Sequence, residues 1–561
     1  MSRRFFLLLA VSLPLCLPLS GLEQNAKPAL GNPDLLAADQ LYKAGKFAEA
    51  AEKYKALLKI DPKLVAAEAG LIESLLREQK IDDASSEAVK ALAAQPNSAV
   101  LLATMGDVQF RLGEMTEAET SYHKALQIDP RELRAYLGLA RIYRAYSFYR
   151  HAYDALKAAH QIAPDDPEVQ RWWLSRLSRR ERIAAIEAYL AGPHPDDAEE
   201  TEHMRRYLEF LKATVDKPVH ACRLVSKVEQ TDTKLERMLR DPRHIAGFGL
   251  PVKLNDRTTH LLLDTGASGI LIGRKSAEKA GLTRISDIRF AGIGDKGWQG
   301  GYLAVADHIR IGDLEFADCI VTVSDRASVT DEDGLIGANV FGSYLIDIDF
   351  PAEKLRLSPL PKRPDETVAP TALDSEGGSR SDPDDAAEGT GDEKAESTSD
   401  AKTAKVAPAP RLPQDRYIAP EMKSWTPIFH FGHQLLIRTE VNDSKPMLFL
   451  IDTGATSNLI SIRAGREVTK VRSDPGVQVK GLSGNVAKVY SADKAVLKFS
   501  RYAHKNQDII SFDLSGLSKH TGTEVSGVLG LQLLRMLQVK IDYRDGLVDF
   551  AYDPSRWQGA H

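Results

Sequence analysis

The sequence predicts a multidomain protein: an all-α helical-repeat solenoid followed by two all-β lobes. Three observations predict this fold class. Proline recurs every 34 residues in the N-terminal part, short β-type runs replace the helical pattern near residue 244, and an Asp-Thr-Gly motif follows an apolar run twice in the β-rich part. Several domains are expected, because 561 residues are too many for one hydrophobic core.

Residues 1–25 have the features of a signal peptide. Met1 to Arg4 form a positively charged start, and the apolar run from Phe5 to Leu19 is short for a membrane span. The start also resembles a twin-arginine signal, so either export route fits. We expect a periplasmic or secreted protein without a stable membrane span after signal cleavage. The alternative is an uncleaved signal that tethers the protein to a membrane.

The cysteines give no indication of metal or redox chemistry. Cys16 lies in the signal peptide, and the remaining Cys222 and Cys319 cannot form a disulfide framework. The sequence also has no C-x-x-C motif and no His/Cys cluster with zinc spacing. We therefore expect no cofactor and no metal.

The charge balance does not favour a nucleic-acid partner. The formal net charge is −5, and residues 361–416 alone carry 8 basic and 13 acidic side chains, so the rest of the chain is balanced. The densest basic cluster runs from Arg171 to Arg182 beside Trp172 and Trp173. We interpret it as the solvated face of an amphipathic helix.

Residues 31–166 contain a repeat of 34 residues. Its prolines, Pro62, Pro96, Pro130 and Pro164, end the second helix of each unit, because proline lacks an N–H and disfavours a helical residue before it. Alanine keeps the same period twelve positions earlier, where a small residue lets two helices approach closely. These units resemble tetratricopeptide repeats. The resemblance implies a protein or peptide partner at the helical repeats.

The rest of the chain divides at changes in composition. Residues 167–243 keep a helical pattern and are predicted to be a cap and connector. Residues 244–360 and 417–557 are β-rich. Between them, residues 361–416 lack aromatic side chains and are rich in Ser, Asp, Glu, Ala and Pro, which predicts a disordered acidic linker.

The two β-rich segments match each other in order and spacing, which indicates an internal duplication. Asp264-Thr265-Gly266 corresponds to Asp452-Thr453-Gly454, and Tyr302 and Tyr490 lie at the same distance after the two aspartates. The other matched pairs are Leu254-Asn255-Asp256 with Val441-Asn442-Asp443, Gly292-Ile293-Gly294 with Gly481-Leu482-Ser483-Gly484, Gly334-Leu335-Ile336-Gly337 with Gly527-Val528-Leu529-Gly530, and Asp349-Phe350 with Asp542-Tyr543.

Each segment therefore resembles one retropepsin-like (acid protease) lobe. Asp-Thr-Gly at a strand end, a glycine-containing hairpin and a later apolar-apolar-Gly strand carry the resemblance. Ala267 and Ala455 match retroviral usage, whereas Ser268 and Thr456 depart from it, since an acid is usual there. The departure puts in doubt the substrate-backbone contact that this acid makes in the family.

The resemblance implies a catalytic pair formed by Asp264 and Asp452. In the aspartic-protease dyad two neighbouring carboxyls share one proton, so that one activates a water and the other protonates the substrate carbonyl. Thr265 and Thr453 would hydrogen-bond across the lobe interface. Gly266 and Gly454 permit close approach of the two loops.

Two glycine-containing hairpins are candidate flaps over a substrate. Gly292 to Gly297 also matches the dinucleotide pattern G-x-G-x-x-G, but it follows no clear strand and opens no helix, which favours a flap. We expect four histidines, His260, His308, His430 and His433, to be ordinary surface or strand residues. The candidate flap or substrate residues are Gly292, Gly294, Trp298, Tyr302, Gly481, Gly484 and Tyr490.

We therefore predict an aspartic endopeptidase that acts on a polypeptide substrate, with helical repeats that recruit substrate or partner. A coil of the linker's length spans about 40 Å, enough for the lobes of one chain to meet. Two alternatives stay open. One is an obligate homodimer with separate Asp264/Asp264 and Asp452/Asp452 sites, and the other is a non-catalytic scaffold that binds proteins.

Overall fold

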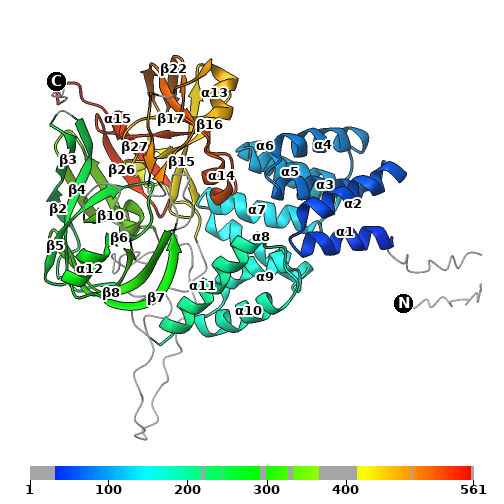
Figure 1. Cartoon of the computed structure of the whole chain (residues 1–561), viewed down its shortest axis with the longest axis horizontal. Coiled ribbons are helices and arrows are strands. Elements are labelled where there is room, and N and C mark those ends of the chain that lie inside the picture. The colour runs from blue at the N-terminus through cyan, green and yellow to red at the C-terminus, as the bar shows by residue number, and fades with distance from the viewer. Residues whose placement is uncertain are drawn as a thin grey trace, which may run out of the picture.

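The computed structural model describes residues 32–216, 222–242, 244–290, 299–325, 333–364, 414–474, 476–481 and 484–556. A helical region is followed by two β lobes, as the sequence predicted (Figure 1). The predicted signal peptide lies outside the described residues, as does the linker apart from residues 361–364 and 414–416.

Four antiparallel helix pairs form the repeats. Each pair ends two residues before one of the periodic prolines. Tyr54 and Tyr122 fill the space between neighbouring helices, and a Cβ at Gly70 or Gly138 would lie 2.4 Å or 2.1 Å from their rings. The helices are α1 (Pro33–Lys43), α2 (Phe47–Ile60), α3 (Val65–Arg77), α4 (Ile81–Ala94), α5 (Ala99–Arg111), α6 (Met115–Ile128), α7 (Leu133–Ala145) and α8 (Tyr149–Ile162).

The connector is shorter than predicted. Its helices are α9 (Pro167–Trp173), α10 (Arg179–Ala191) and α11 (Ala198–Thr214), and residues 223–241 are already strands of the first lobe. The basic cluster is only in part a solvated helix face. Arg180 is 79% exposed, whereas Arg182 donates to the carbonyls of Leu174 and Leu177 and so helps to hold the connector together.

The first lobe is built on a nine-stranded sheet. Its path runs β1-β9-β6-β10-β5-β4-β8-β7, with β3 paired to β4. The lobe contains β1 (Arg223–Leu224), β2 (Thr231–Lys234), β3 (Glu236–Asp241), β4 (His244–Leu254), β5 (Arg257–Asp264), β6 (Ile270–Gly273), α12 (Arg274–Lys279), β7 (Thr283–Phe290), β8 (Gln299–Ile311), β9 (Leu314–Ser324), β10 (Gly334–Gly337), β11 (Tyr344–Asp349) and β12 (Lys354–Pro359).

The second lobe has a ten-stranded sheet and a small hairpin. Its elements up to the hairpin are β13 (Thr426–Pro427), β14 (Phe429–Phe431), β15 (Gln434–Val441), β16 (Met447–Ile451), β17 (Leu459–Ser461), α13 (Ile462–Val468), β18 (Val471–Ser473), β19 (Lys480–Gly481) and β20 (Gly484–Asn485). Then follow β21 (Tyr490–Ala492), β22 (Ala495–Phe499), β23 (Tyr502–Asn506), β24 (Ile509–Phe512), α14 (Ser515–Thr521), β25 (Gly527–Leu529), α15 (Leu531–Leu534), β26 (Gln538–Asp542) and β27 (Leu547–Ala551).

A six-stranded sheet joins the two lobes. Its order is β13-β27-β26-β11-β12-β2, so each lobe supplies three strands, and β11 pairs antiparallel with β26 across the junction. Ile346 and Ile541 are opposite each other in this register, and both are fully buried. One hydrophobic core therefore continues from the first lobe into the second.

The helical region packs against both lobes. Helices α5 to α8 share a hydrophobic core with the second lobe, in which Leu448 lies against the α5–α6 turn. At this contact Thr523 donates to the Phe110 carbonyl over 2.7 Å. Phe210 and Leu211 of α11 share a smaller core with Ile320 of β9 in the first lobe. The helical region and the two β lobes are thus packed together as one body.

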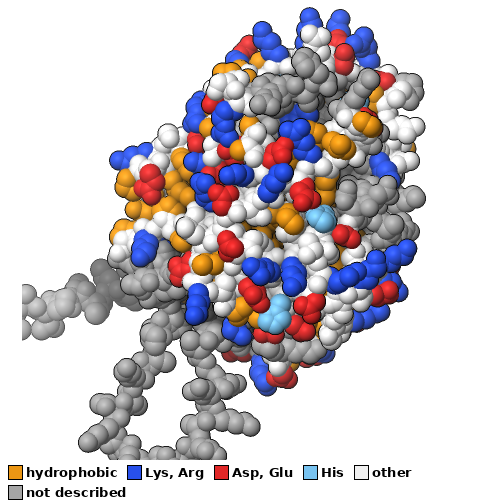
Figure 2. Space-filling model, turned by 90° about the vertical axis from the view of Figure 1, so that its left-hand side faces the viewer, with side chains coloured by type: hydrophobic (Ala, Val, Ile, Leu, Met, Phe, Trp, Pro, Cys, Tyr) orange, Lys and Arg blue, Asp and Glu red, His pale blue; other side chains and the backbone are white. Residues whose placement is uncertain are grey.

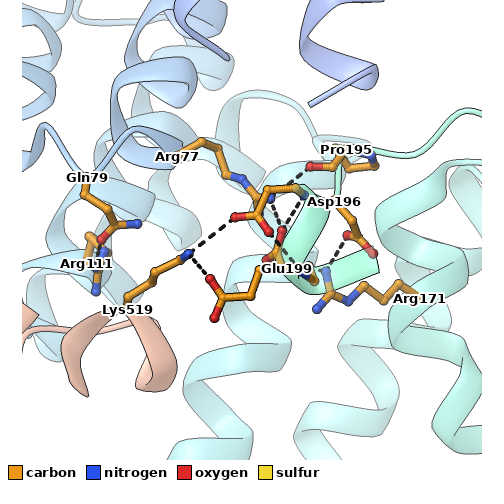
Figure 3. Close-up of polar contacts among 10 residues, drawn as sticks. Arg77, Gln79, Arg111, Arg171, Pro195, Asp196, Glu199 and Lys519 are labelled. Atoms are coloured by element: carbon orange, nitrogen blue, oxygen red, sulfur yellow. Dashed lines mark hydrogen bonds and ion pairs between the residues drawn. The ribbon is translucent and has the colours of Figure 1, made fainter. Parts of the chain in front are cut away.

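Charged side chains close the seam between repeats, connector and second lobe (Figure 3). Arg77 of α3 donates to the Pro195 carbonyl and pairs with Glu200 of α11 at 2.5 Å. From the other side, Lys519 of α14 points to Glu199 and donates to it over 3.1 Å. The start of α11 is held by the repeats and by the second lobe together.

Cys222 and Cys319 form a disulfide, which the sequence did not predict, since two cysteines are too few for a disulfide framework. The bond joins the residue before β1 to β9, its partner strand in the sheet. Because 97 positions separate the two cysteines, the bond closes a long loop and removes conformational freedom from the unfolded chain.

Replacing both cysteines, as in Cys222→Ser with Cys319→Ser, is expected to lower the free energy of unfolding by about 2–4 kcal/mol. Chemical denaturation of the oxidised protein and the double variant measures this difference. Reduction with dithiothreitol should destabilise the wild type and leave the double variant unchanged. Equal stability of all these forms would contradict the expected contribution of the bond.

The two ends of the linker meet. Arg363 donates to the side chain of Gln414 over 2.7 Å and forms a buried ion pair with Asp545. The backbone N–H of Tyr417 donates to the same carboxylate. The linker therefore closes a loop between adjacent points, and the predicted span of about 40 Å is not needed to bring the lobes together.

The described surface has mixed charge. Lys and Arg side chains are interspersed with Asp and Glu over the face in Figure 2. Among the helices that the structure describes, none has the length and apolarity to cross a membrane.

Candidate active site

The two Asp-Thr-Gly loops start at the ends of equivalent buried strands. Asp264 ends β5, and β10 pairs with β5 in parallel so that Gly337 lies opposite Asp264. Asp452 follows β16, which pairs in the same way with β25. The apolar-apolar-Gly segments of the sequence are the strands that support the loops.

Reciprocal hydrogen bonds between the threonines lock the two loops together. The Thr265 hydroxyl donates to the Ile451 carbonyl at 2.8 Å and accepts from the Thr453 N–H at 3.0 Å. The Thr453 hydroxyl donates to the Leu263 carbonyl at 2.8 Å and accepts from the Thr265 N–H at 3.0 Å. Both threonines are buried, so water could not replace these hydrogen bonds if either hydroxyl were removed.

The glycines allow each loop to pass close to the opposite carboxyl. A Cβ at Gly266 would lie 2.6 Å from the Asp452 carboxyl carbon, and a Cβ at Gly454 would lie 2.4 Å from that of Asp264. Any larger residue would therefore displace a carboxyl group. The structure thus brings Asp264 and Asp452 of one chain face to face.

Each carboxyl is held by backbone donors of its own loop. Gly266 N–H donates to Asp264 and Gly454 N–H to Asp452, both over 2.8 Å, and Ala455 N–H donates to Asp452 over 3.0 Å. A further side-chain hydrogen bond joins the two aspartates. This bond requires a proton on one of them.

Burial raises the pKa of both carboxyls, and the charge of Asp452 raises that of Asp264 further. Ionising both groups would place two negative charges side by side away from water. The pair therefore retains one proton at a pH where an exposed carboxyl has lost it. A protonated carboxyl beside a carboxylate can donate and accept a proton in the same reaction.

The predicted flap residues are only partly described. Gly292, Gly294 and Trp298 lie outside the described residues. Tyr302 is buried on β8, where the Arg284 guanidinium lies 4.6 Å from its ring centroid. Tyr302 is thus packed within its own hairpin.

In the second lobe, Gly481 and Gly484 pair across the short β19–β20 hairpin. Tyr490 is half-buried in β21, paired with Ser473 of β18 and Ser511 of β24.

The four histidines have different surroundings. His433, in the turn between β14 and β15, is half-buried, and burial together with the neighbouring His520 lowers its pKa to about 4. His430 is buried in β14, whereas His260 and His308 are exposed beside Glu236 and Glu315. Within the described part of the chain, no group of three or more His, Cys, Asp or Glu side chains could hold a metal ion.

Comparisons with known families agree with both parts of the fold. A family model described as aspartyl protease matches residues 250–340, and one described as tetratricopeptide repeat matches residues 41–107. The search of curated proteins finds no match.

Three solved structures are similar to parts of the chain. The aspartic proteinase from Irpex lacteus has 12% identity and a TM-score of 0.34, covering 59% of this chain and 100% of that one. A thermophilic TPR protein of Thermus thermophilus has 20% identity and a TM-score of 0.26, with coverages of 31% and 96%. The first TPR of Spaghetti (RPAP3), bound to an HSP90 peptide, has 23% identity and a TM-score of 0.18, with coverages of 20% and 87%.

Residues 41–107 therefore contain tetratricopeptide repeats, and residues 250–340 form an aspartyl-protease domain.

Proposed function

We propose that this protein is an aspartic endopeptidase in which Asp264 and Asp452 act as one catalytic pair. The observation that carries the proposal is the reciprocal Thr265–Thr453 hydrogen bonding, which holds the two carboxyls face to face in one buried site. A structural role alone would not need two buried carboxyls that share a proton, because such a pair costs stability.

The proposed reaction needs only these two carboxyls and water. The ionised carboxylate takes a proton from a bound water while the protonated carboxyl donates to the carbonyl oxygen of the substrate. The resulting oxygen nucleophile attacks the carbonyl carbon and forms a tetrahedral intermediate. Proton transfer to the amide nitrogen then breaks the C–N bond. No covalent bond to the enzyme forms.

The joint sheet supports a single-chain pair over separate sites in a homodimer. Strands β11 and β26 pair along five residues, and the lobes share one hydrophobic core. Separate Asp264/Asp264 and Asp452/Asp452 sites would require the lobes of each chain to part, which exposes this core.

We also propose that the helical repeats bind a protein or peptide partner, as the match to tetratricopeptide repeats suggests. The turn after α5 is covered by the second lobe, and the end of α3 is covered by the connector. The partner would therefore bind another part of α1 to α8. The non-catalytic scaffold stays as the alternative, and it predicts partner binding without cleavage.

An extracytoplasmic location, periplasmic or secreted, is part of the proposal. The Cys222–Cys319 disulfide supports it, because disulfides form and persist in oxidising compartments. This support is independent of the N-terminal signal.

A peptide library incubated at acidic to neutral pH, with the Asp264→Asn/Asp452→Asn double variant as control, tests the activity. We expect cleavage by the wild type alone. Activity should fall as rising pH passes the raised pKa of the pair, because loss of the shared proton removes the acid, and again at low pH, where the base is protonated. Identical products from both proteins would overturn the proposal.

A further inference from the structure

The end of α5, in the third helical repeat, holds the second lobe close to the strand that supports Asp452. The Thr523 hydroxyl donates to the Phe110 carbonyl over 2.7 Å, and the Glu524 N–H donates to the Arg111 carbonyl over 2.9 Å. The last four carbonyls of an α-helix lack the partner that the helix gives to its other carbonyls. Two neighbouring residues of the second lobe thus cap α5.

The side chain of Arg111 holds the same part of the second lobe. Its guanidinium donates to the Ser518 carbonyl of α14 over 2.6 Å and also bonds to Gln79 of the preceding repeat (Figure 3). The Ser518 hydroxyl in turn accepts from the Val525 N–H over 2.9 Å. Ser518 is buried, and hydrogen bonds are stronger where water is excluded. Arg111 therefore holds both α14 and the segment that follows it.

This segment continues directly into β25, the short strand that supports the second half-site. The Ser526 N–H donates to the Leu448 carbonyl of β16 over 2.8 Å, and β25 begins at the next residue. The three residues of β25 pair in parallel with β16. At the end of β25, the Leu529 carbonyl accepts from the N–H of Asp452 itself over 3.0 Å. A displacement of residues 523–525 therefore moves the backbone group to which Asp452 is bonded.

In the first lobe the equivalent strand is held by groups of the same lobe. The residue before β10 is Asp333, whose carboxylate accepts from the Ser276 hydroxyl over 2.8 Å and from the His260 N–H over 3.1 Å. The helical region reaches the first lobe elsewhere, on β7, β8 and β9. The contact with the end of α5 thus acts on the half-site of Asp452.

We propose that the end of α5 belongs to the catalytic unit, with Thr523 and Arg111 as positioning residues that fix the backbone of Asp452 through β25. This inference rests on the proposed aspartic-protease function. Catalytic groups have to be held within about 0.5 Å of the productive geometry, so the loss of a bond at the base of this strand lowers the rate. Neither residue takes up a proton in the reaction.

Kinetics of Thr523→Val test the inference, because valine keeps nearly the same shape and removes only the hydroxyl. We expect kcat to fall about fivefold with KM within about twofold, since the carboxyl is misaligned in the transition state while the substrate contacts remain. Thr523→Ser retains the hydroxyl and should recover most of the loss. Thermal unfolding checks that every variant is folded at the assay temperature.

Thr104→Val is the matched control. Its hydroxyl is buried in the same helix and donates to the Val100 carbonyl over 2.9 Å, so this exchange should leave kcat unchanged. Arg111→Ala tests the link from the side of the repeats and should lower kcat by a similar factor, and Arg111→Lys should recover part of it. An unchanged kcat in both Thr523→Val and Arg111→Ala would overturn the inference, as would a loss that Thr523→Ser does not recover or that Thr104→Val shares.

An infrared titration separates this inference from the proposed function. The carboxyl band lost in the Asp264→Asn/Asp452→Asn variant reports the shared proton. Its midpoint should move upward by about half a pH unit in Thr523→Val and stay in place in Thr104→Val, because a carboxylate misaligned with its backbone donors retains its proton to higher pH. A shifted midpoint in a protein that cleaves no peptide would reject the proposed protease activity and support the positioning role. An unshifted midpoint in an active protease would reject the positioning role alone.

Discussion

Asp264→Asn and Asp452→Asn, made separately, are each expected to lower kcat/KM by about a thousandfold or more. One carboxyl must act as base while the other acts as acid, and asparagine can do neither. The side chains are nearly equal in size, so the Thr265–Thr453 hydrogen bonds should survive in both variants. Rates with a peptide substrate chosen from the library measure the effect.

Asp443→Asn provides the control for this pair. Its carboxylate lies in the turn before the second loop and is 82% exposed, so its loss should leave kcat/KM unchanged. If one of the two single variants kept about half of the wild-type activity, separate sites in a homodimer would explain the data and the single-chain pair would be wrong. A mixture of Asp264→Asn and Asp452→Asn chains should remain inactive, because each chain carries its own damaged pair.

A chain that begins at residue 222 and lacks the helical region is expected to aggregate. The repeats cover an apolar face of the second lobe, and each large side chain uncovered there costs about 1.5–3 kcal/mol. Light scattering and size-exclusion chromatography after expression measure the outcome. The buried side chains of this face are Phe429, Leu436, Leu448, Leu450, Leu459, Phe512, Leu514, Val525 and Val528.

A point variant tests the same contact in the complete chain. Leu448→Ala should lower the free energy of unfolding by about 2–5 kcal/mol, because it leaves a cavity against the α5–α6 turn. Leu239→Ala is the matched control, because it removes the same kind of side chain at a position that is 56% exposed. It should change the free energy of unfolding by less than about 0.5 kcal/mol. Lobes that stay monomeric and equally stable without the helical region would show that the repeats are an independent module.

Local patterns predicted the elements whose residues interact with near neighbours. The proline period marks the helix ends, because each of the four helix pairs ends two residues before a periodic proline. The end of the connector, from residue 223, was wrongly predicted, because its strands form by pairing with residues far away in the sequence. Residues 231–234 have no hydrophobic alternation and become a strand only by pairing with β12, more than 120 positions later.

The functional and covalent features likewise separate into those that a local motif predicted and those that depend on long-range contacts. The repeated Asp-Thr-Gly motif and its resemblance to retropepsin-like lobes predicted that both aspartates and both threonines belong to the candidate site. The Cys222–Cys319 bond was not predicted, since it joins residues that are 97 positions apart in the sequence.

By itself, the sequence determined the repeat, the linker composition and two half-sites, because each of these is written in residues adjacent along the chain. Only the tertiary structure decided that the half-sites meet within one chain, that the repeats share a core with the second lobe, and that Cys222 and Cys319 form a disulfide. These features depend on the burial of surfaces contributed by distant segments, and the free energy of such burial follows from three-dimensional packing rather than local periodicity.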